Sequence, residues 1–192
     1  MMQWQMDGRS YPYLPQRRWN ERDIELPWAV SILAQAKGRV LEVGNATQHS
    51  TQQPARTIVD RWDRAFGPMP IERVDIVGFD GGPYDLILSV STLEHVGTDK
   101  EEEPDRGKAV RAFDHCVGLL APGGEFWLTI PCGYHPELQA HVLDTCDDVW
   151  VMGRKGMFSL RWTEMFVEAA DCDFPWEWES ARRVIFARYV KP

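Results

Sequence analysis

A turn with the chemistry of proton transfer follows one of the apolar runs of this 192-residue sequence. It collects hydroxyl groups at Ser89 and Ser91, a carboxylate at Glu94 and an imidazole at His95. Histidine is the side chain best suited to take or give a proton near neutral pH. The turn therefore predicts a general base at His95, with Glu94 as the second candidate. The structural alternative is a histidine that only caps the turn.

A glycine turn ends the first apolar run. Gly44 and Asn45 follow the run Val40–Val43, and glycine at this point permits a positive φ or close approach of another group to the backbone. Glu42, two residues before the glycine, could bond a cationic or hydroxyl group beside the turn. An ordinary tight turn with a solvated glutamate explains the same residues, so this fragment alone leaves both interpretations open.

Two aspartates mark the ends of further runs. Asp60 closes a second strand-like segment, where a carboxylate can accept hydrogen bonds from ribose hydroxyls. In the third segment, Asp75 could accept from an adenine amino group while the N–H of Ile76 meets a ring nitrogen. Exposed carboxylates at strand ends are the structural alternative for both positions.

Segments of strand and helix type alternate along the chain and would position these side chains. Near-continuous Val, Ile and Leu runs predict strands buried on both faces, as in a parallel sheet covered by helices. The expected strands are 39–43, 57–60, 73–77, 85–90, 126–130, 149–152 and 183–190, and the expected helices are 23–37, 110–120 and 136–143. The pattern predicts an α/β open sheet, in which ligands bind at the carboxyl ends of the strands. The candidate residues lie at or near such ends.

Composition narrows the classes of function. Lys and Arg total 21 against 29 Asp and Glu, and the net charge of −8 argues against a nonspecific nucleic-acid or membrane-surface binder. The four cysteines form no C-x-x-C pair or zinc motif, so we expect reduced thiols in a cytoplasmic protein without a metal site. No apolar run reaches about 18 residues, and the polar start does not have the pattern of a signal peptide. Nine tryptophans, many outside strongly apolar runs, stand out.

Three motifs, taken in order, carry a family resemblance. They are Val40-Leu41-Glu42-Val43-Gly44, the segment 84–89 running into Leu93-Glu94-His95-Val96, and Leu120-Ala121-Pro122-Gly123-Gly124. They resemble the class I S-adenosylmethionine-dependent methyltransferases over residues 38–131. The resemblance implies a Rossmann-like open sheet of seven mostly parallel strands in the order 3-2-1-4-5-7-6, with the last strand antiparallel. It also implies a single domain over 1–192, with an N-terminal arm and helix (1–37), a cofactor-binding core (38–131) and a C-terminal part (132–192).

The same resemblance implies roles for the candidate residues. Carried over one by one, Glu42 and Gly44 would face the methionine part of S-adenosylmethionine with Asn45 beside them, Asp60 would bind the ribose, and Asp75 with Ile76 the adenine. Ser89 and residues 91–95 would line the cofactor and the acceptor pocket.

The sequence departs from the family at the glycine loop. The family's loop is G-x-G-x-G followed by a helix, whereas only the first glycine stands in the segment 44–49, GNATQH. The 13 residues from Asn45 to Thr57 barely reach the dozen that a parallel crossover needs, and Pro54 interrupts them. We therefore expect the helix after the first strand to be very short or missing. Residues 17–22 and 25–28 could replace the missing wall of the site, or could form a docked N-terminal arm.

The resemblance predicts an enzyme that moves a methyl group from S-adenosylmethionine to an oxygen or nitrogen of a small-molecule or glycan-type acceptor. Catalysis would depend on alignment of the acceptor with the methyl group, and His95 would take the acceptor's proton. The alternative, to which the eroded loop points, is a non-catalytic binding or scaffold protein on the same fold. A dinucleotide-dependent oxidoreductase fits poorly because the G-x-G-x-x-G fingerprint is absent. No metal, nucleic acid or membrane is expected as a partner, and the oligomeric state is left open.

Overall fold

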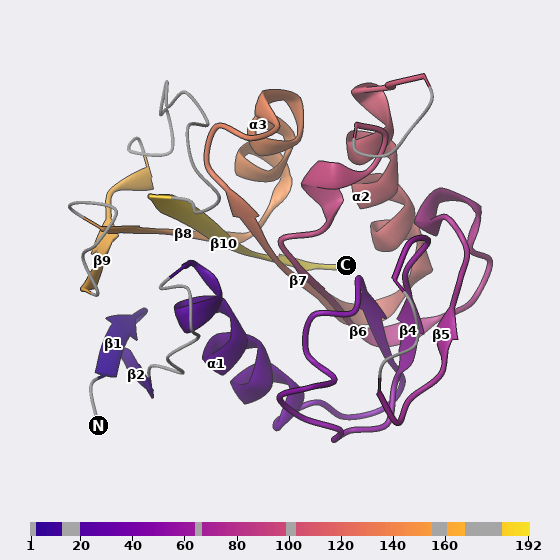
Figure 1. Ribbon diagram of the computed structural model, residues 1–192, viewed down its shortest axis with the longest axis horizontal. Helices are drawn as coiled ribbons and strands as arrows, with labels where there is room; N and C mark the ends of the chain where they lie inside the picture. Colours follow the sequence, from indigo (N-terminus) through magenta and orange to yellow (C-terminus); the bar gives the residue numbers. More distant parts are fainter. Residues whose placement is uncertain (1–2, 13–19, 64–66, 99–102, 155–160, 168–181) are drawn as a thin grey trace.

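A computed structural model describes residues 3–12, 20–63, 67–98, 103–154, 161–167 and 182–192. These residues form an eight-stranded sheet, a separate hairpin and three α-helices (Figure 1). In spatial order the sheet contains β5 (Ile71–Glu72), β4 (Thr57–Val59), β3 (Val40–Val43), β6 (Tyr84–Val90), β7 (Leu120–Pro131), β10 (Arg183–Val190), β8 (Asp148–Arg154) and β9 (Trp162–Met165). Within the described part of the chain, none of the helices meets the length and apolarity that a membrane-spanning segment requires.

The sheet is mostly parallel at one end and antiparallel at the other. Strands β5, β4, β3, β6 and β7 pair in parallel, whereas β10 runs antiparallel to both of its neighbours, β7 and β8. The expected count of seven strands was wrong for the described residues, because β9 pairs antiparallel with β8 and adds an eighth. Without β9, the remaining strands follow the order 3-2-1-4-5-7-6 when numbered along the chain.

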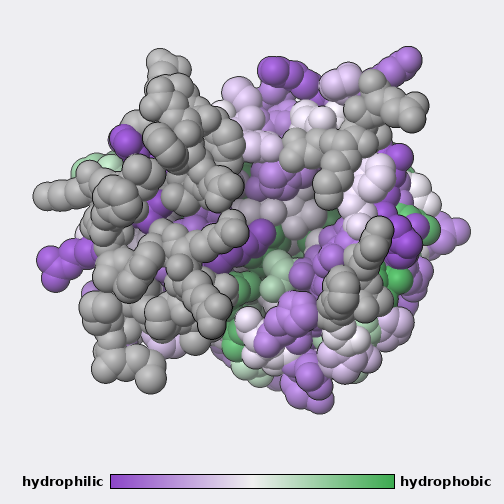
Figure 2. Space-filling model, viewed as in Figure 1, coloured by the Kyte–Doolittle hydropathy of each residue, from purple (hydrophilic) through white to green (hydrophobic). Residues whose placement is uncertain are grey.

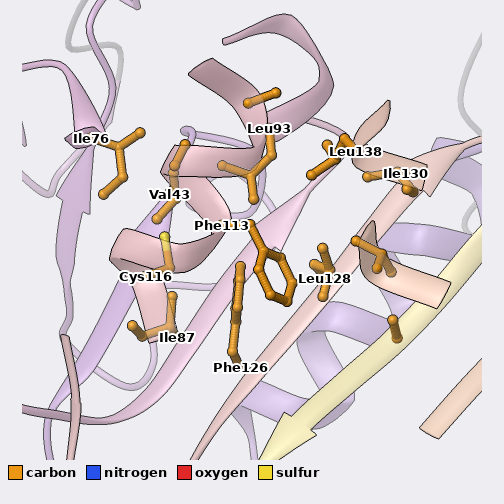
Figure 3. Close-up of a cluster of buried hydrophobic side chains, with 14 of the residues drawn as sticks. Val43, Ile76, Ile87, Leu93, Phe113, Cys116, Phe126, Leu128, Ile130 and Leu138 are labelled. Carbon is orange, nitrogen blue, oxygen red and sulfur yellow. The ribbon is translucent and has the colours of Figure 1, made fainter. Parts of the chain in front are cut away.

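Both faces of the sheet are covered, which explains the near-continuous apolar runs of its central strands. Helices α2 (Gly107–Leu119) and α3 (Pro136–Thr145) cover one face, where Phe113 lies 5.3 Å from Phe126, centroid to centroid (Figure 3). Helix α1 (Arg22–Leu33) and the hairpin of β1 (Gln3–Met6) and β2 (Arg9–Pro12) cover the other. There Trp4 and Trp28 pack on Phe186, so two of the tryptophans that stood out in the sequence belong to the core.

Three elements depart most from the bounds that the sequence predicted. The expected third strand at 73–77 is found as β5 at Ile71–Glu72, followed by the short 3-10 helix η1 (Ile76–Gly78). Asp75 accepts a hydrogen bond from the Val77 N–H at 3.1 Å, which caps η1 and ends the extended conformation. Helix α1 stops at Leu33 rather than at residue 37, and β7 begins at Leu120, before the expected 126–130.

The crossover from β3 to β4 contains no helix, as its length and Pro54 predicted. Residues 44–56, all of them described, form turns and irregular backbone. Inside this crossover the Arg56 Nε donates to Glu42 Oε2 at 2.6 Å and the Arg56 Nη2 to Thr47 Oγ1 at 2.7 Å, and the Glu42 and Arg56 side chains are fully buried. A network of polar side chains therefore organises the segment in place of a helix.

Candidate functional site

A cavity of about 430 Å³ lies at the carboxyl ends of β3, β4 and β6. This is the place where open α/β sheets bind their ligands. Figure 2 shows the molecule hollowed near the centre of one face, with apolar residues at the floor and hydrophilic residues around it. The lining residues are Arg22, Val43, Gly44, Val59, Asp60, Arg61, Trp62, Asp63, Val74, Asp75, Ile76, Ser91, Thr92, His95 and Val96. They include the predicted site residues Gly44, Asp60, Asp75, Ile76, Ser91 and His95.

Gly44 forms the turn at the end of β3. Its φ of +85° lies in the left-handed region that favours glycine, and its N–H donates to Val59 O at 2.8 Å. A Cβ at this position would lie 2.2 Å from Thr92 Oγ1, so a side chain would push against the turn that follows β6. The turn requires glycine both for its backbone conformation and for close packing at the cavity wall.

Asp60 follows β4 with its carboxylate held by backbone amides. Oδ1 accepts from the N–H groups of Trp62 (2.9 Å) and Asp63 (2.8 Å), and Oδ2 accepts from the Asn45 N–H at 3.2 Å. A carboxylate offers about four acceptor positions, so Oδ2 retains one for a ligand hydroxyl. The Asn45 side chain binds Asp63 Oδ2 at 2.7 Å, and Asn45 does not line the cavity.

Asp75 follows β5, at the edge of the sheet, and is held by two cations. Its Oδ2 is 2.6 Å from Lys108 Nζ and 3.1 Å from Arg61 Nη1. Burial alone would raise the pKa of Asp75, but the hydrogen bonds from Lys108 and the Val77 N–H, with the charges of Lys108 and Arg61, lower it below its ordinary value. The carboxylate stays ionised and fixed beside Ile76.

The turn after β6 brings Ser91 and His95 to the cavity. Ser91 has a φ of +39°, unusual for a residue with a side chain, and its Oγ donates to Glu25 Oε1 of α1 at 2.5 Å. The His95 side chain is 43% exposed and its ring packs edge-on against Tyr134, with centroids 4.8 Å apart. A half-exposed imidazole at the cavity wall has access to a proton on a bound molecule.

Glu94 does not line the cavity, although the next residue, His95, does. Its carboxyl group is buried, its Oε1 is 3.6 Å from His95 Nε2, and neither oxygen accepts a hydrogen bond from the described residues. Burial raises the pKa of Glu94 to about 8. The group is therefore mostly protonated near pH 7.

Glu42 and Ser89 also lie outside the residues that line the cavity. The predicted position of Glu42, facing a cofactor, is not where its carboxylate lies, because Thr47 and Arg56 of the crossover hold both of its oxygens. Ser89 is buried within β6.

Trp62 and Arg22 are among the lining residues that were not predicted as site residues. Trp62 is 44% exposed, stacks under the Arg61 guanidinium at 4.6 Å and faces the cavity just after Asp60. Arg22 comes from α1 and belongs to the segment 17–22 that could replace the missing wall; residues 17–19 lie outside the described residues. A tryptophan two residues after a strand-end acid was the signal available for Trp62.

No protein-family model matches the sequence, and no curated protein is similar to it. Solved structures do match. The N-methyltransferase NodS from Bradyrhizobium japonicum WM9, in complex with S-adenosyl-L-homocysteine, is 19% identical, covers 92% of this chain and 95% of its own, and has a TM-score of 0.55. The PH0226 protein from Pyrococcus horikoshii OT3 is 12% identical over 95% of both chains, with a TM-score of 0.52. An rRNA methylase from Streptococcus thermophilus is 8% identical over 88% of this chain and 97% of its own, with a TM-score of 0.50. With the strand order of its sheet, these similarities show that the chain has the fold of the class I S-adenosylmethionine-dependent methyltransferases.

Proposed function

We propose that the protein is an S-adenosylmethionine-dependent methyltransferase that acts on an oxygen or nitrogen of a small-molecule or glycan-type acceptor. One observation carries the proposal: four separate segments bring Gly44, Asp60, Asp75 and His95 to one cavity at the ligand-binding edge of the sheet. Solved structures of the same fold include an N-methyltransferase in complex with S-adenosyl-L-homocysteine.

The residues of the cavity fit the parts of this cofactor. Asp60 Oδ2 would accept from the ribose, Asp75 and Ile76 would bind the adenine edge, and the exposed Trp62 offers a flat surface to the purine. Gly44 and Ser91 would border the methionine part. The volume of about 430 Å³ falls within the range of about 300–1,000 Å³ typical of small-molecule sites.

The chemistry asks the protein mainly to align the reactants and to remove a proton. When bound, S-adenosylmethionine supplies an electrophilic methyl group. The cavity wall holds an acceptor near it, and His95 takes the acceptor's proton on a ring nitrogen. We assign the base to His95 rather than to Glu94, because the Glu94 carboxyl group is buried and does not line the cavity.

We propose a small acceptor because the space available next to His95 is limited. A second recess of about 150 Å³, lined by Thr98, Arg106, Tyr134, His135, Pro136 and Glu137, shares Tyr134 with the wall that supports His95. The net charge of −8 disfavours a nucleic-acid acceptor. We also propose a reducing, cytoplasmic compartment, in which the thiols of Cys116 and Cys146 would stay reduced.

Calorimetric titration with S-adenosylmethionine and S-adenosylhomocysteine tests the proposal. We expect saturable binding of both at one site, and Asp60→Asn is expected to weaken it by about tenfold because a charged acceptor is lost. Asp114→Asn is the matched control, since Asp114 is an exposed α2 residue that pairs with His141 away from the cavity. No binding at millimolar ligand would sink the methyltransferase proposal.

That negative result would favour the second candidate, a non-catalytic binding or scaffold protein. The observation behind it is the crossover after β3, which has no helix and whose buried polar groups bind one another. A protein that had lost its cofactor could keep such a crossover because the crossover stabilises the fold by itself.

A further inference from the structure

The crossover after β3 has no helix, and therefore offers no helix N-terminus to bind an anion beside the Gly44 turn. A helix N-terminus offers unpaired N–H groups and a positive dipole end to a carboxylate or phosphate. Residues 44–56 contain no helix, and the Thr47 N–H donates to Glu42 Oε1 at 2.7 Å. At the Gly44 end of the cavity, a negative group therefore needs another partner.

Arg22 of α1 lies at that end of the cavity. Its Nη1 donates to Val90 O at 2.9 Å and its Nη2 to Ser91 O at 3.4 Å, which fixes the guanidinium against the turn after β6. The next residue of that turn, Thr92, packs against Gly44. Arg22, Ser91, Thr92 and Gly44 thus line a continuous part of the cavity at α1 and the ends of β3 and β6, whereas Asp75 follows β5 at the edge of the sheet.

The Arg22 guanidinium keeps donors for a ligand. It carries five N–H groups in a planar fork. The two carbonyls and the ion pair of Nη1 with Glu25 Oε2 at 3.4 Å leave Nε without a partner among the described residues. The Nε–H and one Nη2–H lie on the same edge of the guanidinium, the arrangement that binds a carboxylate with two hydrogen bonds. The side chain is 30% exposed and lines the cavity.

Glu25 keeps Arg22 in place. Its buried carboxylate accepts from Ser91 Oγ at 2.5 Å and Thr129 Oγ1 at 2.7 Å, which ties α1 to the ends of β6 and β7. The ion pair with Arg22 then orients the guanidinium along the cavity wall. Glu25 is thus a positioning residue for Arg22.

We propose that Arg22 binds the α-carboxylate of the amino-acid part of S-adenosylmethionine, in place of the segment that follows β3. The inference rests on the proposed function and names the residue that holds one end of the cofactor. Arg61, the other arginine of the cavity, has a different position, because it pairs with Asp75 at 3.1 Å and stacks on Trp62.

Two ligands can distinguish binding at the amino-acid end of the site from binding at the adenosine end. S-adenosylhomocysteine contains the α-carboxylate, whereas 5′-methylthioadenosine keeps the adenine, ribose and sulfur and lacks it. Calorimetry would measure both affinities in the wild type, Arg22→Met, Arg22→Lys and Arg61→Met. We expect Arg22→Met to weaken S-adenosylhomocysteine by about 10- to 100-fold and 5′-methylthioadenosine by less than about threefold, from the usual strength of charge-assisted pairs. Arg22→Lys should fall between, because a point charge makes no bidentate contact.

Arg61→Met is the matched control and should change both affinities by the same factor. Retained binding of 5′-methylthioadenosine by Arg22→Met would also show that the loss of two carbonyl contacts has not disturbed the adenosine half. Equal weakening of both ligands by Arg22→Met, or no weakening of either, would overturn the inference and leave the proposed function standing. If the wild type binds neither ligand, the proposed function fails and the inference with it.

Discussion

Arg56 donates through Nε to Glu42 at 2.6 Å, and this buried ion pair holds together a crossover that has no helix. The same guanidinium donates to Thr47 Oγ1 (2.7 Å) and to the carbonyls of Thr51 and Pro54 (3.1 Å each). One side chain thus fixes both ends and the middle of the segment. The family resemblance assigned the Glu42 carboxylate to the cofactor, but in the structure this carboxylate binds Thr47 and Arg56 of the crossover.

Removal of Arg56 should destabilise the fold strongly. Arg56→Met leaves the fully buried Glu42 carboxylate without its charge partner, and we expect a loss of about 3–5 kcal/mol in the free energy of unfolding, measured by urea denaturation. The double variant Glu42→Gln/Arg56→Met should be more stable than Arg56→Met alone, because no unpaired buried charge remains.

The control for this experiment is Arg111→Met, which breaks an exposed pair with Asp105 and should change stability little. Equal losses for Arg56→Met and Arg111→Met would show that the buried pair does not organise the crossover.

Trp62 should contribute to ligand binding without contributing to stability. Its side chain is 44% exposed at the cavity, and stacking of a base on an aromatic ring is worth about 1–3 kcal/mol. Trp62→Ala should therefore weaken S-adenosylhomocysteine by about 5- to 100-fold in calorimetry and leave the unfolding midpoint nearly unchanged. Phe166→Ala, at an 86% exposed position beyond β9, is the control and should alter neither quantity. Unchanged affinity in Trp62→Ala would remove Trp62 from the site.

Glu94 should make the protein less stable as pH rises. The pKa of Glu94 is about 8 in the folded protein against an ordinary value of 4.5, so between these values the folded state holds a proton that the unfolded state has released. Stability contributed by this group is present below about pH 4.5 and is lost progressively towards pH 8. Urea midpoints measured from pH 5 to 8 should fall less steeply for Glu94→Gln than for the wild type. Parallel curves would mean that Glu94 is ionised in the folded protein.

His95 should affect turnover more than cofactor binding. Loss of a general base typically slows a reaction by about 10²- to 10⁴-fold. With an acceptor found by screening small amines and alcohols, His95→Asn should lose activity on that scale and bind S-adenosylhomocysteine within about threefold of the wild type. His141→Asn, on α3 and paired with Asp114, should behave as the wild type. Intact turnover in His95→Asn would exclude the general-base role.

The elements that depend on local pattern could be predicted from the sequence. The apolar run 183–190 is β10 with the predicted bounds, and the short crossover with Pro54 lacks a helix as expected. Strand β9 was missed because WTEM has no continuous apolar run, and only its pairing with β8 makes it a strand. The third strand was misplaced because Asp75 caps its own turn at Val77, and this local side-chain hydrogen bond competes with the strand propensity of the Val and Ile residues around it.

The candidate site likewise has residues that the local sequence pattern predicts and residues whose positions depend on tertiary contacts. Gly44, Asp60, Asp75, Ile76, Ser91 and His95 line the cavity because the carboxyl ends of parallel strands meet at one edge. The position of Glu42 could not be predicted, since its partner Arg56 follows 14 residues later and nothing local links the two. The place of Arg22 depends on how α1 packs against β6, which is a tertiary relationship.

The structure of a crystal soaked with S-adenosylhomocysteine would show whether this cavity binds the cofactor. We expect ligand density that extends from Arg22 and Gly44, past Asp60, to Asp75 and Trp62, with the sulfur nearest His95. Clear protein density at the cavity without ligand, in crystals soaked at millimolar concentration, would contradict the claim that this cavity is a cofactor site.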